Sequence, residues 1–397
     1  MVGGCTLEWP LLQRFSFLEE VQPRGTFSQM FRAWDESHKR NVFVKVSDSE
    51  KVEIEHKALE ALSASSAAAF VPHVFELLQL PVQSVLVLDL FGENLARLAG
   101  GHLCAPTVSY VGAQMVSAIA AIQKAGYVHR NIQPSSFAWS ADGAPSKIVL
   151  LDFGFACCHL EQSGRPKKPH LACTFRGNLF YASPNAHACK DLGRRDDFYG
   201  LAYCLFEFST GPLPWSEISA HAAAIHMEKG YLGYAAHQIS SGDKAPVHPD
   251  LIKVRDYLAA APHPLLEFLL SLNLLDYYSE PNYESLIKIL KKLDPRGEGA
   301  ETVFQEMTRC KPPAAADSSV SADVGADKTI ASPPVKRRMT CKTTPPPLTP
   351  EKQFPRKKRE SRARREAKQK WGRDVAKCPH CGLEVSKSNL AKHCKRH

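Results

Sequence analysis

No run of 18 or more apolar residues occurs in the sequence. A helix that crosses a membrane needs about that length, so we expect no membrane partner. The first residues, MVGGCTLEWPLLQRF, lack a basic start followed by an apolar stretch, which argues against a secretory signal. The 12 cysteines lack the spacing of a disulfide framework, and most lie scattered in apolar segments. This pattern is typical of reduced, buried thiols in an intracellular protein.

Positive charge is concentrated at one end of the chain. Residues 336–397 hold 20 Lys and Arg against 5 Asp and Glu, a net charge of +15, whereas the whole chain carries +9. Residues 1–335 therefore sum to −6. A mildly acidic body with a strongly basic tail favours nucleic acid, an acidic partner or nuclear import. The length of 397 residues, with 44% apolar and 23% charged residues, allows two or three units in a soluble globular protein.

The stretch with the clearest chemistry is YVHRNIQPSSFAW, followed after a short polar gap by IVLLDFGFA. The apolar run Ile148–Leu151 predicts a buried strand that ends in Asp-Phe-Gly, and Pro134 keeps the preceding loop from forming a helix. This text resembles the catalytic loop and the metal-binding loop of eukaryotic protein kinases. That family has Asp, Lys and Asn at three positions where this chain has Asn131, Gln133 and Ser136.

Residues 15–46 alternate apolar and polar side chains, which predicts three strands with a turn through Asp35–Arg40. In a kinase the first turn carries three glycines whose bare backbone lies over the phosphates of ATP. Pro23, Gly25 and Ser28 stand at those places. Proline donates no N–H and a serine side chain stiffens the approach to phosphate, so only Gly25 keeps the role. An ordinary hairpin is the equal alternative for this segment.

The same resemblance implies three further parts of a nucleotide site. The strand NVFVKV matches the V-A-I-K strand of kinases and places Lys45 where the phosphate-binding lysine lies. Residues 49–63 have apolar residues at helical spacing, and Glu55 falls where that helix offers a glutamate to the lysine. Outside this order of motifs, both would be interpreted as solvated surface charges. Asp89 and Leu90 follow a predicted hairpin of buried strands and would form the hinge between two lobes.

Motifs later in the chain make the resemblance more specific. The segments TFRGNLFYASPNAH, GRRDD and LFEFSTGPLPW look like the casein kinase I group and, within it, the tau-tubulin kinase branch. That group ends its activation segment with S-x-N-A-H, as this chain does. The resemblance covers about residues 15–295. It implies an α+β, two-lobed kinase fold, with a small β-rich lobe over residues 1–90 and a larger helical lobe over residues 91–295.

The substituted positions predict a catalytically impaired enzyme. The aspartate of the family accepts the proton of the substrate hydroxyl, whereas the amide of Asn131 cannot, a loss that typically costs a factor of about 10² to 10⁴ in rate. Gln133 lacks the positive charge held near the transferred phosphate, and Ser136 is a shorter, weaker Mg²⁺ ligand than asparagine. The retained lysine, glutamate and Asp152 would still support one nucleotide with one Mg²⁺. Asp152 is equally expected if its turn is structural.

Four other charged residues acquire roles from the resemblance. Asp197 matches the aspartate of a core helix that holds the backbone of the His-Arg loop. Arg176, Arg194 and Arg195 resemble the basic cluster that related kinases use for acidic or phosphorylated substrates. A solvated or ion-paired face is the equal alternative for these arginines.

The apolar periodicity stops near the end of the kinase-like region. Residues 296–350 are rich in Pro, Ala, Ser, Thr and Asp, which predicts a disordered linker. Residues 351–377 form a basic segment, and the clusters at 336–338 and 356–359 look like a split nuclear-import signal. Residues 356–373 would form a basic helix more readily against phosphates than in free solution. We therefore predict a nuclear protein, with the cytoplasm as a second location.

Residues 378–397 resemble a Cys₂His₂ zinc finger with the spacing Cys378-x₂-Cys381-x₁₁-His393-x₃-His397, one residue shorter than usual between the pairs. Two thiolates and two imidazoles match tetrahedral Zn²⁺. A segment of this size has too small a core to fold without a metal. The sequence thus predicts a zinc site at these four residues.

Three interpretations of function remain open. In the first, a nuclear pseudokinase offers its kinase fold to protein partners as a scaffold, while residues 336–397 contact DNA, RNA or an acidic protein. In the second, the chain is an active serine/threonine kinase with unusual loop chemistry that uses ATP and Mg²⁺. In the third, the basic tail is a nucleic-acid-binding module and the kinase fold is a spacer. The sequence carries no sign of an oligomeric state.

Overall fold

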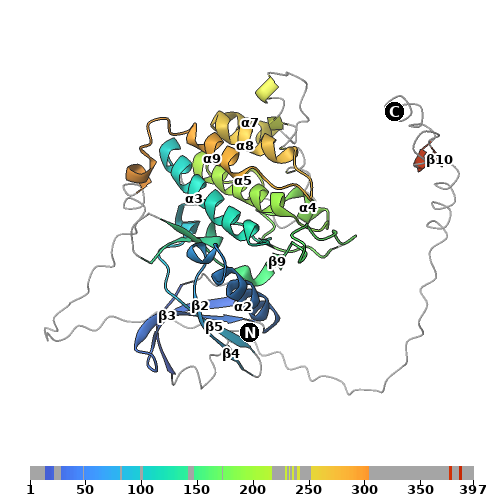
Figure 1. Ribbon diagram of the computed structural model, residues 1–397. Helices are drawn as coiled ribbons and strands as arrows, with labels where there is room; N and C mark the ends of the chain where they lie inside the picture. Colours follow the sequence, from blue (N-terminus) through green and yellow to red (C-terminus); the bar gives the residue numbers. More distant parts are fainter. Residues whose placement is uncertain are drawn as a thin grey trace, which may run out of the picture. The chain divides into compact units, whose positions relative to one another are not determined.

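The structure is a computed structural model, and it divides the chain into two units, residues 1–318 and 319–397. It describes residues 14–21, 28–47, 49–80, 83–98, 102–141, 147–171, 173–216, 229, 232, 235–236, 239–241, 252–303, 375–377 and 384–386. The first unit has the predicted α+β fold, in which a small sheet-based lobe lies against a larger helical lobe (Figure 1).

The small lobe is built on one antiparallel sheet in the order β1-β2-β3-β5-β4. Its elements are β1 (Phe15–Glu20), β2 (Ser28–Asp35), β3 (Arg40–Ser47), α2 (Ser49–Ser63), β4 (Val74–Gln79) and β5 (Ser84–Leu88). Successive side chains of a strand point to opposite faces. Val42, Val44 and Val46 of β3 therefore pack into a small core on one face. Phe43 belongs to the main core, which continues into the helical lobe, and Lys45 lies on the same face as Phe43.

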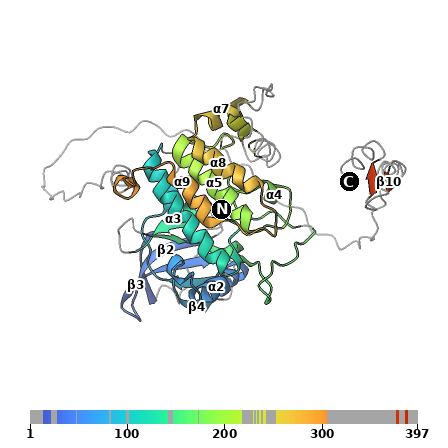
Figure 2. The same cartoon turned by 45° about the horizontal axis from the view of Figure 1, so that its top comes forward.

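The large lobe consists mainly of helices. Its elements are α3 (Ala105–Lys124), β6 (Tyr127–Val128), β7 (Phe137–Trp139), β8 (Ile148–Leu150), β9 (Cys157–Cys158), α4 (Pro184–His187), α5 (Arg194–Thr210), α7 (Ile252–Ala260), α8 (His263–Asn273) and α9 (Tyr283–Lys291). Helices α3 and α8 both pack against α5 and α9 (Figure 2). Gly112 permits this approach, because a Cβ there would lie 2.9 Å from Leu205 of α5 and 3.0 Å from Leu290 of α9.

Helix α3 is the one helix among the described residues that is long and apolar enough to cross a membrane. However, 67% of its most apolar window is buried inside the domain. Val108, Met115 and Ile119 are fully buried there. Packing within the large lobe therefore accounts for the apolar character of this helix.

The folded domain ends later than the sequence predicts. Val303 is fully buried, and Thr107 of α3 donates a hydrogen bond to the hydroxyl of Thr302 at 3.3 Å. The carboxylate of Asp294 accepts the backbone N–H of Gly299 at 2.8 Å. The prediction that a linker starts at residue 296 is therefore wrong by at least eight positions. Polar contacts hold this turn, and such contacts leave no apolar periodicity in the sequence from which the turn could be predicted. Residues 304–350 lie outside the described part.

In the second unit the structure describes two short strands, β10 (Val375–Lys377) and β11 (Glu384–Ser386). They pair antiparallel, with Lys377 opposite Glu384. The predicted zinc ligands Cys378, Cys381, His393 and His397 lie outside the described residues, as does the predicted basic helix. The zinc site therefore stays a prediction.

Candidate functional site

Three charged side chains from separate elements meet between the lobes. Nζ of Lys45, on β3, lies 2.6 Å from the Glu55 carboxylate of α2 and 2.7 Å from Oδ1 of Asp152, which follows β8. The backbone N–H of Phe153 also donates to Glu55, at 3.3 Å. Lys45 and Glu55 are each only 2% exposed. The structure thus brings together the three residues that the sequence assigned to nucleotide and metal binding.

The charges in this cluster are set by burial and by the contacts. Burial acts to lower the pKa of Lys45, but the carboxylates of Asp152 and Glu55 raise it above the ordinary value. Burial also raises the pKa of Glu55. It acts in the same direction on Asp152, yet Lys45 and the amide of Asn131 hold the pKa of Asp152 below its ordinary value. At neutral pH a charged lysine therefore faces a deprotonated Asp152.

Asn131 occupies the place of the catalytic aspartate, and its amide points at Asp152. Its Nδ2 donates a hydrogen bond to Oδ2 of Asp152 at 2.9 Å. Lys45 takes the other oxygen of the same carboxylate. Each oxygen of the Asp152 carboxylate thus accepts a hydrogen bond, one from Lys45 and one from Asn131. An aspartate at position 131 would instead place a second negative charge against this carboxylate.

The side chains of the other two substituted residues of the loop form hydrogen bonds with other groups of the protein. Ser136 is fully buried, and its hydroxyl donates to the backbone carbonyl of Asn131 at 2.7 Å. Gln133 accepts a hydrogen bond at 2.6 Å from the amide of Asn178, in the activation segment. The Ser136 hydroxyl thus closes the turn of the loop, and its role as a weakened metal ligand stays a prediction. Gln133 links the loop to the activation segment.

Asp197 of α5 holds the backbone of the same loop. Its carboxylate accepts the N–H groups of His129 at 3.0 Å and Arg130 at 2.8 Å. Burial lowers the pKa of His129. A neutral ring donates from Nε2 to the carbonyl of Leu151 at 2.9 Å, while Nδ1 accepts the N–H of Asn131 at 3.3 Å. Arg130 has φ of 64°, a left-handed conformation that is maintained where surrounding contacts over-determine it.

A cavity of about 190 Å³ opens beside these groups. Its lining includes Ser28 at the end of the glycine-loop segment, together with Lys45, Glu55, Asn131 and Asp152. Pro23 and Gly25 lie outside the described residues, so the state of that loop stays a prediction. The predicted hinge residues follow β5, where Asp89 donates its N–H to the carbonyl of His73 at 2.9 Å. Neither Asp89 nor Leu90 is among the described residues that line this cavity.

Phe43 of β3 forms an aromatic pair with Phe91, which directly follows the predicted hinge residues. Phe43 and Phe91 have ring centroids 4.2 Å apart and planes inclined by 32°. They are 5% and 9% exposed and belong to the continuous core that spans both lobes. Phe43 pairs with Leu88 in the strand register, and it stands at the alanine of the V-A-I-K pattern. Sequence reasoning missed this residue, although comparing V-F-V-K with V-A-I-K would have found it.

The predicted basic cluster is divided by the structure. Arg194 is 6% exposed and lies 3.3 Å from the carboxylate of Glu280. Arg195 donates to the backbone carbonyl of Leu275. Both arginines therefore hold the loop between α8 and α9, which fits the ion-paired alternative. Arg176 lines a separate cavity beneath the activation segment.

Comparison with known proteins defines the class to which this architecture belongs. Residues 20–296 match the protein kinase domain family, so the chain belongs to that family. It is also 29% identical over 276 residues to a probable serine/threonine-protein kinase of Dictyostelium discoideum. The match covers 67% of this chain and 51% of that protein, so the chain spans about half the length of the curated relative.

Proposed function

We propose that the protein is a nuclear pseudokinase of casein kinase I type, whose kinase domain serves as a scaffold for protein partners instead of transferring phosphate. The hydrogen bond from the Asn131 amide to Asp152 carries this proposal. An amide has no basic site that can take the proton of a substrate hydroxyl. The acidic side chains among the described residues that line the cavity are Glu55 and Asp152, and both are paired with Lys45. The cleft therefore offers no free base in the described region.

The fit of an adenine nucleotide with Mg²⁺ differs between the two ends of the cleft. At the phosphate end, Lys45 would hold phosphate and Asp152 would hold the metal, and the donor set suits both. At the hinge end, Phe43 packs against Phe91 and stands where the V-A-I-K pattern has the small side chain of alanine. We propose that this bulky side chain hinders the adenine ring, so that the cleft binds ATP weakly or not at all.

Phosphotransfer assays of the full chain test the proposal against the active-kinase alternative. Labelled ATP, Mg²⁺ or Mn²⁺ and acidic protein substrates would be compared for the wild type and for Lys45→Met. We expect equal background signals, and no rise in the wild-type melting temperature with ATP and metal, because a ligand that binds the folded state raises that temperature. Turnover that disappears in Lys45→Met would refute the pseudokinase and support an active serine/threonine kinase.

A second function is proposed for the tail, in which Zn²⁺ folds a finger that contacts nucleic acid or an acidic partner. The pairing of β10 with β11 favours it, because a hairpin across the segment that holds Cys378 and Cys381 suits a Cys-x₂-Cys knuckle. The net charge of +15 on residues 336–397 predicts binding that weakens steeply with salt. Titration of labelled DNA and RNA into the full chain at several salt concentrations tests this. An affinity that does not change on replacing both cysteines by serine would remove the finger from the interaction.

A further inference from the structure

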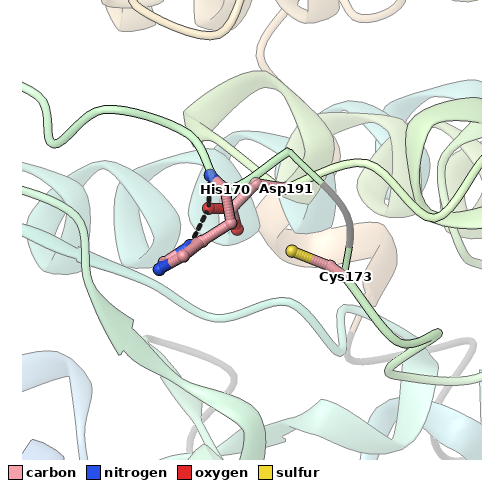
Figure 3. Close-up of side chains that lie close together, drawn as sticks. All are labelled: His170, Cys173 and Asp191. Carbon is pink, nitrogen blue, oxygen red and sulfur yellow. Dashed lines mark hydrogen bonds and ion pairs between the residues drawn. The ribbon is translucent and has the colours of Figure 1, made fainter.

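A cluster of potential metal ligands lies at the activation segment, outside the cleft between the lobes. His170, Cys173 and Asp191 bring a ring nitrogen, a sulfur and a carboxylate oxygen within 4.8 Å of one another (Figure 3). His170 and Cys173 lie in the segment between β9 and α4, and Asp191 lies in the loop before α5. The cluster therefore joins the activation segment to the main body of the large lobe.

Asp191 organises the cluster. One of its oxygens accepts the backbone N–H of His170 at 3.0 Å and contacts Nδ1 of the same residue at 2.7 Å. Its other oxygen accepts the N–H of Leu192 at 3.1 Å. The backbone N–H of Cys173 donates to the carbonyl of Cys189 at 3.0 Å. These bonds fix the backbones that carry the three donors, so only the exposed ring of His170 needs to adjust to a metal.

The cavity next to the cluster holds further groups of the same chemistry. It measures about 450 Å³ and is also lined by Cys157, Cys158 and His159. His159 is 3% exposed, and its Nε2 lacks a hydrogen-bond partner within the described part of the chain. A buried ring nitrogen without a partner is rare, since such groups are nearly always satisfied. His159 therefore adds a buried imidazole to the wall of the cavity beside the cluster.

The ligand atoms of this cluster indicate which metal ion it would bind. One sulfur, one imidazole nitrogen and one carboxylate oxygen match Zn²⁺, whereas Mg²⁺ and Ca²⁺ prefer oxygen alone. We propose that His170, Cys173 and Asp191 form a zinc site that fixes the activation segment to the loop before α5. On binding, the Cys173 thiol gives its proton to solvent, and the His170 ring carries its proton on Nε2, which leaves Nδ1 free to bind Zn²⁺. The thiolate and carboxylate balance the charge of the ion.

Three protein ligands leave one position of a tetrahedral ion free, and the cavity has room for a water there. A metal at this place would order the activation segment without any phosphorylation. In kinases that segment is usually ordered by a phosphate that pairs with arginine. The order of the activation segment would thus depend on the available concentration of Zn²⁺ and not on phosphorylation.

Metal binding by the full chain tests the proposal. Cys378→Ser with Cys381→Ser first removes the predicted finger ligands. The zinc content of this variant is then measured by competition with a coloured chelator, and thiolate ligation by the absorption of bound Co²⁺. We expect about one ion per chain. Adding Cys173→Ser should abolish the sulfur-to-cobalt band and weaken binding by more than the roughly 10- to 100-fold that loss of a supporting contact costs. Cys104→Ser, a cysteine away from the cluster just before α3, should change neither measurement.

Proteolysis of the wild-type chain gives a second readout that does not depend on the finger. Leu171 is fully exposed between the two ligands, so chymotrypsin should cut after it, and Zn²⁺ should slow that cut in the wild type but not in Cys173→Ser. The proposal is overturned if the finger-less variant binds no zinc, or if Cys173→Ser binds it as well as its parent. Unchanged cleavage after Leu171 with Zn²⁺ would equally overturn it.

Discussion

Replacing Asn131 by aspartate should make the stability of the kinase domain depend on Mg²⁺. The amide now donates to Oδ2 of Asp152 at 2.9 Å. A second carboxylate at that distance would repel Asp152 by about 6 kcal/mol at an effective dielectric constant of 20. The lost hydrogen bond to a charged group adds about 1.5 to 3 kcal/mol. Protonation or rotation of one carboxyl would relieve most of this, so we expect the free energy of unfolding to fall by about 2 to 4 kcal/mol.

Thermal unfolding with and without millimolar MgCl₂ measures the effect. A loss of this size should lower the melting temperature of Asn131→Asp by about 3 to 7 °C in the absence of metal. Mg²⁺ between the two carboxylates should restore much of it. Asn131→Leu is the matched control, because it removes the hydrogen bond without adding charge and should lose stability whether or not Mg²⁺ is present. The wild type should be equally indifferent to Mg²⁺.

Two outcomes would refute this reasoning. If Asn131→Asp melts at the wild-type temperature without metal, the amide is not what holds Asp152. If the wild type itself gains stability from Mg²⁺, Asp152 still binds metal despite its two donors. The second result would favour the alternative that the chain is an active kinase.

Three further substitutions test other contacts. Phe43→Ala should cost about 3 to 5 kcal/mol of stability and make the melting temperature respond to ATP, whereas Phe137→Ala, equally buried elsewhere, should show the loss alone. Burial acts to raise the pKa of Asp35, but Arg14 and a neighbouring histidine hold that pKa well below the ordinary value. The deprotonated Asp35 carboxylate therefore stabilises the fold above pH 4, and this contribution is lost as pH falls through the lowered pKa. Arg14→Ala should cost about 2 to 3 kcal/mol and move acid unfolding to higher pH, as followed by circular dichroism. Burial lowers the pKa of Lys229, and Lys229→Met should cost about 2 to 3 kcal/mol in urea unfolding because two backbone carbonyls lose their donor.

Local periodicity predicted the elements around the site. The apolar spacing of residues 49–63 gave α2 with the bounds that the structure has. The alternation in residues 15–46 gave β1 to β3, and the predicted strand Ile148–Leu151 gave β8, which ends one residue earlier. These patterns succeed because each is created by one face of an element packing against the core. The order of motifs then placed Lys45 and Glu55 in contact, which spacing alone does not do.

Contacts between distant residues were beyond the reach of those patterns. Phe43 and Phe91 meet across the hinge, and no periodicity relates two single aromatic residues. The hydroxyl of Ser136 faces its own loop and not the cleft, a matter of side-chain direction that sequence letters do not encode. His170 and Asp191 are brought together by the course of the activation segment. Such pairs depend on the tertiary fold, so the structure had to supply them.

We propose that Lys45, Glu55 and Asp152 are kept because they stabilise one another. Removing one partner of a buried ion pair leaves an uncompensated charge and costs about 3 to 5 kcal/mol. Lys45→Met would leave the buried carboxylate of Glu55 and the half-buried carboxylate of Asp152 without their shared cation, so it should be destabilised by about that amount. Adding Glu55→Gln and Asp152→Asn should recover most of the loss, because the charges then disappear together.

Urea unfolding of the single and triple variants decides the point. If the triple variant regains the free energy of unfolding, the three charged groups serve to neutralise one another, and their presence is no evidence of phosphoryl transfer. A triple variant no more stable than Lys45→Met would instead mean that each side chain is needed individually, as a site that binds a ligand would require. The same measurement shows whether Lys45→Met is folded well enough to serve as the control in phosphotransfer assays.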